Sequence, residues 1–172
     1  MSFNLDRRTL MIGLGAAAGS TAFSKLAFSE SHASAEGPQT FEIEMLNRDP
    51  DNPRQRNVFL PRIQVANPGD TIKFVATDRG HNALTIADMV PEGAEGWKGK
   101  LNEEIEVTLE TPGAYGYLCT PHSALGMVGL ILVKGEGLQA SMETAKAVKH
   151  RGRAASVWEE IWAEVESENL LG

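Results

Sequence analysis

Hydrophobic and polar residues alternate along much of the chain between residues 40 and 134. In the first such segment, Phe41, Ile43 and Met45 are separated by Glu42 and Glu44. A two-residue period of this kind is typical of a β-strand with one buried face. Similar alternation, or an apolar run of strand length, predicts further strands at 62–65, 71–76, 82–86, 105–109, 114–118 and 128–133.

Turn signals separate these predicted strands. Residues 67–70 read Asn-Pro-Gly-Asp, and residues 111–113 read Thr-Pro-Gly. The run at 128–133 is continuously apolar, which suits a strand buried on both faces. Short strands divided by Pro and Gly turns predict an all-β sandwich or barrel. The polar segment at 49–54 is expected to be a surface loop.

The period changes after Gly135. Residues 138–150 are rich in Ala, Lys, Met and Glu, and from 154 to 170 the apolar residues recur at spacings of three and four. This spacing is helical. We therefore predict two helices, divided near Gly152, and expect the Trp-containing stripe of the second to pack into a core. The predicted units are a sandwich over 36–135 and a helical extension over 136–172 that packs on it.

The first 35 residues have the features of an export signal. Arg7 and Arg8 precede an uncharged apolar run at 10–22, and Ala-Ser-Ala at 33–35 resembles a cleavage site. The run is shorter than the roughly 20 residues of a membrane span, so we expect no stable membrane association. The arginine pair fits either a twin-arginine or a general secretory signal. The predicted location is the periplasm, with the mature chain beginning at or just before Glu36.

Charge and cysteine content narrow the function further. The chain has 16 Lys and Arg against 23 Asp and Glu, a net charge of −7. This balance argues against nucleic acids and anionic membrane surfaces as partners. A single cysteine, Cys119, excludes an internal disulfide. In an oxidising compartment a lone thiol requires burial or a metal.

Three potential metal ligands of different types lie in one short segment. Cys119, His122 and Met127 fall between two predicted strands, and His81 lies upstream, where a neighbouring strand is expected to end. Two imidazoles, one thiolate and a weakly bound thioether are the ligand set of a blue-copper electron-transfer centre. We therefore predict one copper ion held by these four residues.

Other chemistries fit this ligand set less well. Zinc favours four strong ligands, and a thioether is a poor one. Iron–sulfur clusters need more cysteines than the chain has. A catalytic Cys–His pair would require a third, orienting group. The spacing of Cys119 and His122 suits one loop and not the usual helix-borne nucleophile, and the sequence shows no oxyanion-hole motif. Non-ligand roles in the signal, the tail or packing are assigned to His32, His150, Met89 and Met142.

With these residues in view, the chain resembles the pseudoazurins, small type-1 copper proteins of the cupredoxin family. The resemblance extends over about 40–170 and is carried by 45–47, 67–71, 77–82, 89–95, 112–115 and 119–122. It implies an all-β Greek-key cupredoxin sandwich with two C-terminal α-helices. It also implies that His81, Cys119 and His122 are equatorial ligands, that Met127 is axial, and that Asn82 braces the ligand loop.

The resemblance further implies a function without enzymatic activity. Members of the family are monomeric periplasmic shuttles that pass single electrons between respiratory redox proteins, including copper nitrite reductase, c-type cytochromes and cytochrome peroxidase. An alternative is a periplasmic copper carrier or storage module. A cupredoxin-like oxidase or reductase would need a second copper site and more histidines than the chain has.

Some positions depart from the family pattern. Leu125 stands beside the proposed ligand His122 where a Met is common, and Asn57 stands at another frequent Met position. Both are expected to tune the potential and to leave copper binding intact. An apolar patch around the His122 ring is expected from Pro121, Ala124, Leu125 and Gly126. The usual lysine ring is thinner, with Arg48, Arg79, Lys98 and Lys100 as rim residues, and this weakens the expectation of a nitrite reductase partner.

Overall fold

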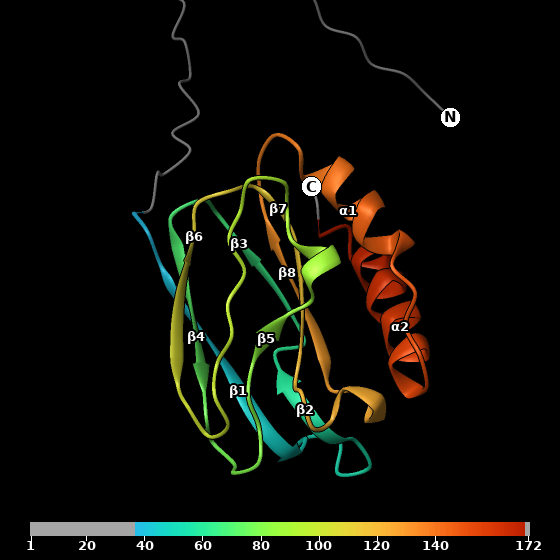
Figure 1. Ribbon diagram of the computed structural model, residues 1–172. Helices are drawn as coiled ribbons and strands as arrows, with labels where there is room; N and C mark the ends of the chain where they lie inside the picture. The colour runs from blue at the N-terminus through green and yellow to red at the C-terminus, as the bar shows by residue number, and fades with distance from the viewer. Residues whose placement is uncertain (1–36, 171–172) are drawn as a thin grey trace, which may run out of the picture. The chain divides into compact units, whose positions relative to one another are not determined.

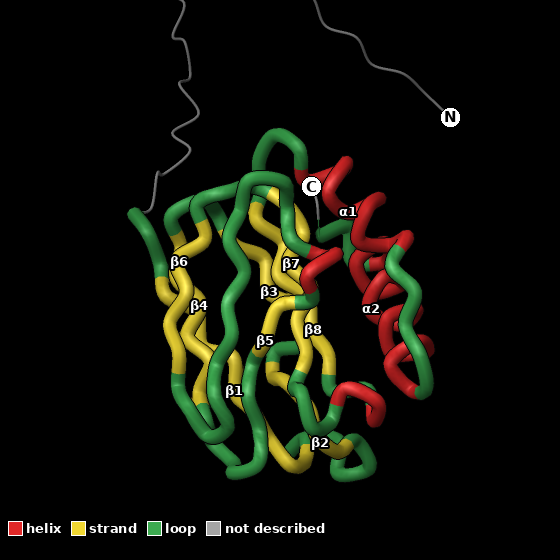
Figure 2. The backbone as a smooth tube through the Cα atoms, viewed as in Figure 1, coloured by secondary structure: helices red, strands yellow, loops and turns green. Residues whose placement is uncertain are grey.

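The computed structural model describes residues 37–170, and within them eight strands form two four-stranded sheets (Figures 1 and 2). The first sheet has the order β2-β1-β4-β6, made of Arg56–Leu60, Thr40–Arg48, Asp70–Val75 and Ile105–Leu109. The second has the order β3-β8-β7-β5, made of Ile63–Ala66, Val128–Val133, Gly113–Leu118 and Leu84–Thr85. The predicted two-sheet sandwich with two C-terminal helices is confirmed.

Alternating side chains of both sheets fill the space between them. Ile43 and Met45 of β1 and Ile72 and Phe74 of β4 are fully buried in one core cluster. The intervening residues of these strands face outward, where Lys73 pairs with Glu42 at 3.3 Å. The two-residue period of the sequence therefore marks the buried face correctly.

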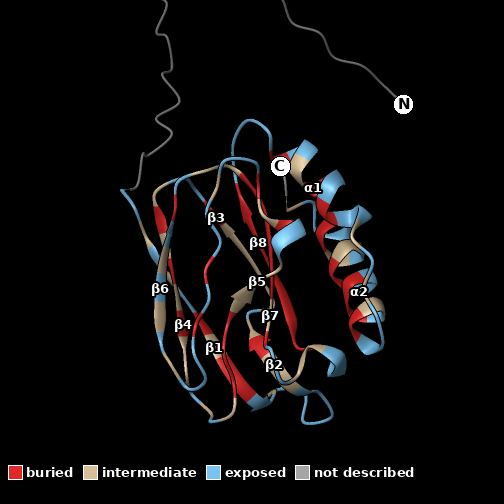
Figure 3. Cartoon of the chain, in the orientation of Figure 1, coloured by how far each residue is buried: buried red, intermediate tan, exposed pale blue. Residues whose placement is uncertain are grey.

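The strand β8 is buried on both faces, as its continuous apolar sequence predicts (Figure 3). Ile131 and Val133 belong to the cluster between the sheets. Leu130 and Leu132 belong to a second cluster that includes residues of both helices. Because successive side chains of a strand point to opposite faces, β8 joins the inner core to the core beneath the helices.

The helices α1 (Leu138–Ala147) and α2 (Arg153–Ser167) lie side by side against the second sheet (Figure 1). Buried residues of α2 line its inner face: Val157, Trp158, Ile161 and Val165. The predicted packing role of the Trp stripe is confirmed. Gly152, with φ +62°, separates the helices as expected. Both helices end three residues before the predicted ends: α1 at Ala147 instead of 150, and α2 at Ser167 instead of 170.

Two strand predictions need correction. β2 was not predicted, because its sequence shows no alternation of apolar and polar residues. In the structure, its residue Asn57 adopts φ +53°, a value that L-residues rarely adopt in a strand. β5 spans only Leu84–Thr85 instead of 82–86. Asn82 instead donates its side-chain N–H to the carbonyl of Gly99, so this end of the segment follows a loop.

The export-signal prediction concerns residues 1–35, which lie outside the described residues. Within residues 37–170, no helix is long and apolar enough to cross a membrane.

His150 closes the connection between the helices in an aromatic stack. Its ring stacks on Trp158 with centroids 5.0 Å apart, and Trp158 stacks on Trp162 at 5.7 Å. Burial lowers the pKa of His150 below its ordinary value of 6.5. Charged residues lining the adjacent hollow include Lys146, Lys149 and Glu159. The folded chain therefore favours the neutral imidazole at this position.

We predict a pH-dependent contribution of His150 to stability. Below about pH 6.5 the unfolded chain binds a proton more readily than the folded one, so this contribution falls as the pH drops. In His150→Gln it is absent. The measurement is the free energy of urea unfolding of the native chain and of this variant from pH 7.5 to 5. The amount by which the native value exceeds that of the variant should decrease as the pH is lowered. A constant difference would contradict the prediction.

Candidate metal centre

Three potential ligand atoms form a small triangle at one end of the sandwich. The Cys119 Sγ lies 3.7 Å from His81 Nδ1 and 3.5 Å from His122 Nδ1, and the two nitrogens are 3.1 Å apart. Bonds from such atoms to a transition metal are about 2.0–2.3 Å long, so ligands of one ion lie about 3–4 Å apart. The triangle fits one ion bound to all three atoms.

The paired strands β7 and β8 place the two sulfur-containing residues. The ladder between them ends with Leu118 opposite Val128, and the next residue, Cys119, donates its backbone N–H to the carbonyl of Met127 at 3.0 Å. Cys119 and Met127 are both fully buried in the inner core cluster. They therefore continue the inward faces of their strands, and the loop between them carries His122.

His81 comes from the loop after β4, in the other sheet, and is fully buried. Its Nε2 lies 3.0 Å from Asn47 Oδ1. Because that oxygen only accepts, the Nε2–H donates and Nδ1 is left to face the triangle. Asp78 fastens the same loop to β1: its side chain accepts from the Asn47 N–H at 2.7 Å, and its own N–H donates to Met45 at 3.0 Å.

Asn82 links the His81 loop to the ligand loop. Its Oδ1 accepts from the Thr120 N–H at 2.8 Å, and its Nδ2 donates to the Gly99 carbonyl at 3.0 Å and to Thr120 Oγ1 at 3.1 Å. With 8% of its surface exposed, the side chain is buried. The bracing role expected for Asn82 matches these contacts.

Burial sets the protonation of the cluster. It raises the pKa of the Cys119 thiol, a rise that the backbone N–H groups of Asn82 and His122 oppose. Burial and the neighbouring His122 lower the pKa of His81, against a smaller opposing effect of Asp78. Neutral imidazoles are ready to bind a metal, and a bound cation deprotonates a coordinating thiol. The donor chemistry therefore fits a soft cation.

Comparison with known proteins agrees with this site. Residues 54–134 match the family model for copper binding proteins of the plastocyanin/azurin family. A pseudoazurin of Paracoccus pantotrophus is 45% identical over 112 residues, covering 64% of this chain and 74% of the relative. The chain belongs to the pseudoazurin family. A second pseudoazurin, from Methylorubrum extorquens, is 36% identical, with 72% and 80% covered.

Solved pseudoazurins share the whole architecture. The structure of one from Sinorhizobium superposes with a TM-score of 0.70 at 45% identity, covering 75% of this chain and 98% of that one. Pseudoazurins are copper electron carriers and not enzymes, so this chain is a copper electron-transfer protein of that type. Its cofactor is copper, and the cluster of buried Cys119, buried His81 and half-buried His122 is typical of a type-1 site.

The surroundings of this pseudoazurin-type site include residues that sequence reasoning missed. Asn47 and Thr120 appeared only within family motifs, and nothing in the sequence indicated their contacts with His81 and Asn82. Asn102, at φ +61°, accepts the Gly80 N–H at 2.6 Å and donates its own N–H to the His81 carbonyl at 2.8 Å. Its position twenty-one residues after His81 gives no local signal of this pairing.

Three of the remaining candidates, Met89, Met142 and His150, lie within the described residues. Met89 and Met142 are buried in the core beneath the helices, and His150 is not part of the cluster of His81, Cys119 and His122. His32 lies outside the described residues. His122 is half-buried, and Leu125 beside it is 54% exposed.

Removing the Asn82 side chain should weaken the fold around the site. In Asn82→Ala the Thr120 N–H and the Gly99 carbonyl lose buried partners, so we expect a loss of roughly 2–3 kcal/mol in the free energy of unfolding. Thr120→Val is the matched control, because it deletes only one acceptor on an exposed residue and should cost less than about 1 kcal/mol. Urea unfolding of both variants measures the difference. Equal losses would contradict the assigned role.

Proposed function

We propose that His81, Cys119 and His122 are the equatorial ligands of a single type-1 copper and that Met127 is its axial ligand. The observation that carries this proposal is the triangle of Nδ1, Nδ1 and Sγ atoms, with sides of 3.1–3.7 Å, at one end of the sandwich. Copper bound there supplies a one-electron couple, Cu(II)/Cu(I). The protein would pass single electrons between redox partners.

The chain's contribution is a ligand set held in place by the fold. The His122 N–H donates to the Cys119 carbonyl at 3.1 Å, and the Met127 N–H donates to the His122 carbonyl at 3.2 Å. These bonds tie the three loop residues together, while Asn47 orients His81 from the other sheet. Ligands fixed in this way move little when the charge at the site changes, which favours electron transfer over release of copper as a carrier or store.

The partly exposed His122 marks the proposed point of electron exit. Pro121, Ala124 and Leu125 around it are exposed, which gives a small apolar contact area suited to transient docking. Lys98, Lys100 and Leu101 line a depression next to Pro121. A basic and apolar rim on a chain of net charge −7 favours acidic redox partners; copper nitrite reductase, c-type cytochromes and cytochrome peroxidase are our candidates.

The proposed setting is the periplasm. This location rests on the export-signal pattern of residues 1–35 and on the family's role, and it is compatible with a lone buried cysteine. In our proposed division, the mature protein is the sandwich of 36–135 with the helical extension of 136–172, acting as a monomer.

Replacing Met127 tests the axial assignment. In Met127→Leu, copper should remain bound and the protein coloured by its thiolate-to-copper absorption. The potential should rise by roughly 60 mV or more, a tenfold change in relative affinity for the two oxidation states. The reason is that the site loses its axial donor, and a lower coordination number destabilises Cu(II) more than Cu(I). A redox titration measures this. Met89→Leu is the matched control, because Met89 is a methionine buried in the core beneath the helices. This variant should leave the potential unchanged.

The visible absorption spectrum of the copper-loaded protein tests the ligand assignment itself. Native protein that binds one copper but shows no intense visible absorption would contradict a type-1 centre. Cys119→Ser should lose the colour, because it removes the thiolate.

Charge reversal tests the docking rim. Arg79→Glu with Lys98→Glu should slow electron transfer to copper nitrite reductase or a c-type cytochrome by about tenfold at low salt, and the effect should shrink as salt screens it. Stopped-flow rates at two ionic strengths measure this. Lys134→Glu is the control, because Lys134 follows the end of β8 opposite to the ligand loop. An equal effect of the control would remove these residues from the docking surface.

A further inference from the structure

The ligand loop and the beginning of α2 are in direct contact. A methyl group built on the Gly126 Cα would lie 2.8 Å from Val157 Cγ2 and 3.3 Å from Arg153 Cγ. One built on Gly152 would lie 3.3 Å from the Ala124 carbonyl oxygen. Van der Waals contact at these positions therefore involves the loop's backbone. The first turns of α2 rest on the segment between the proposed ligands His122 and Met127.

The loop has little other support on this side. Its short helical turn, Ser123–Leu125, contains no buried residue, and Gly126 follows with φ +92° and a local hydrogen bond to Ser123 at 3.0 Å. Asn82 braces the opposite end of the loop through Thr120. The contact with α2 is thus a second brace, applied next to Met127.

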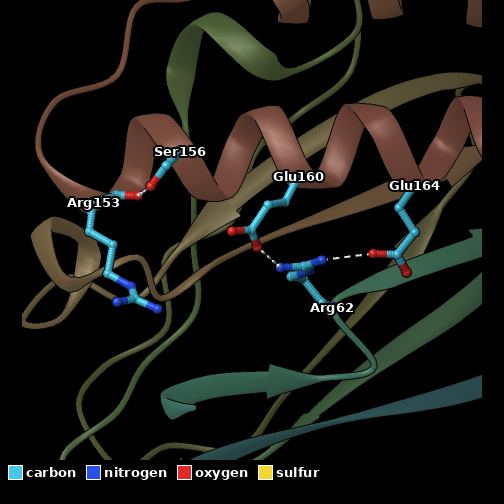
Figure 4. Close-up of polar contacts among 5 residues, drawn as sticks. All are labelled: Arg62, Arg153, Ser156, Glu160 and Glu164. Carbon is cyan, nitrogen blue, oxygen red and sulfur yellow. Dashed lines mark hydrogen bonds and ion pairs between the residues drawn. The ribbon is translucent and has the colours of Figure 1, made fainter. Parts of the chain in front are cut away.

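The helix that applies this contact is itself anchored. Val157 belongs to the core beneath the helices, together with Val128 of β8. Arg62 reaches from the start of the second sheet to both Glu160 and Glu164 of α2, at 3.0 and 2.7 Å (Figure 4). Arg153 lies at the N-terminal end of α2, away from the ion pairs of Arg62 with Glu160 and Glu164. A helix fixed at several points can hold a loop that touches it.

We propose that Val157 and Arg153 are positioning residues for the copper site, an inference that rests on the ligand set proposed above. Their contact with Gly126 limits movement of its neighbour Met127. It also limits movement of His122, whose carbonyl accepts the backbone N–H groups of Leu125 and Met127 at 2.9 and 3.2 Å. The C-terminal helices therefore pre-organise the metal loop in addition to covering the sheet.

Amide hydrogen exchange tests this role directly. In Val157→Ala, exchange at Leu125 and Met127 should become at least about tenfold faster, because the loop opens locally more often. Val165→Ala is the matched control: it truncates the same residue type, buried on the same helix, two turns farther from the loop. It should lower the Tm without this local effect. NMR on the diamagnetic copper(I) protein and on the metal-free chain provides both measurements.

An exposed pair of variants covers the case in which Val157→Ala folds poorly. Arg153→Ala removes the side-chain stem that lies over Gly126. Arg151→Ala is the control, because Arg151 is also exposed and the side-chain atoms nearest Gly126 belong to Val157 and Arg153. Faster loop exchange, with a changed visible spectrum or potential, is expected for Arg153→Ala alone.

The outcomes separate two kinds of failure. Loop exchange rates that match between each variant and its control overturn the positioning role. A native protein that takes up copper without a thiolate-to-copper band overturns the proposed ligand set instead, because the exchange contrast does not depend on that colour.

Discussion

The antiparallel pairing of β7 with β8 is the constraint on which the metal centre depends. Tyr115 and Tyr117 face the inner core, and the same face of β7 continues to Cys119. On β8, Ile131 shares that face with Met127. Because side chains alternate along a strand, a slip of one residue would turn a sulfur away from the site toward the helices. The register that buries the core therefore also places the two sulfur-containing residues.

His81 makes the metal site depend on how the two sheets pack against each other. His81 follows β4 in one sheet, whereas Cys119 follows β7 in the other, so the 3.7 Å between His81 Nδ1 and Cys119 Sγ depends on how the sheets pack. Aromatic contacts fix that packing directly below: Tyr117 of the second sheet meets Phe74 of the first, with centroids 5.1 Å apart. Core packing and ligand geometry are thus one property of the fold.

The sequence predicted those parts of the molecule that depend on local pattern. Alternation located β1 and β4, the apolar run located β8, and ligand types with their spacing identified the copper loop. It did not predict contacts between distant segments: Asn47 with His81, Asn102 with Gly80, and Arg153 with Gly126 join residues whose proximity is decided by the assembled sandwich. β2 was missed for a related reason, since its pairing with β1 outweighs a sequence without strand periodicity.

The two faces of the sandwich explain why the helical extension belongs to the site. Outward residues of the first sheet, such as Glu42 and Lys73, are charged and tolerate water. Outward residues of β8 are Val128, Leu130 and Leu132, which need a cover. Since the hydrophobic effect drives α1 and α2 onto that face, and since β8 begins directly after Met127, the cover necessarily extends to the ligand loop. A requirement of burial thereby places a helix where it can influence the metal centre.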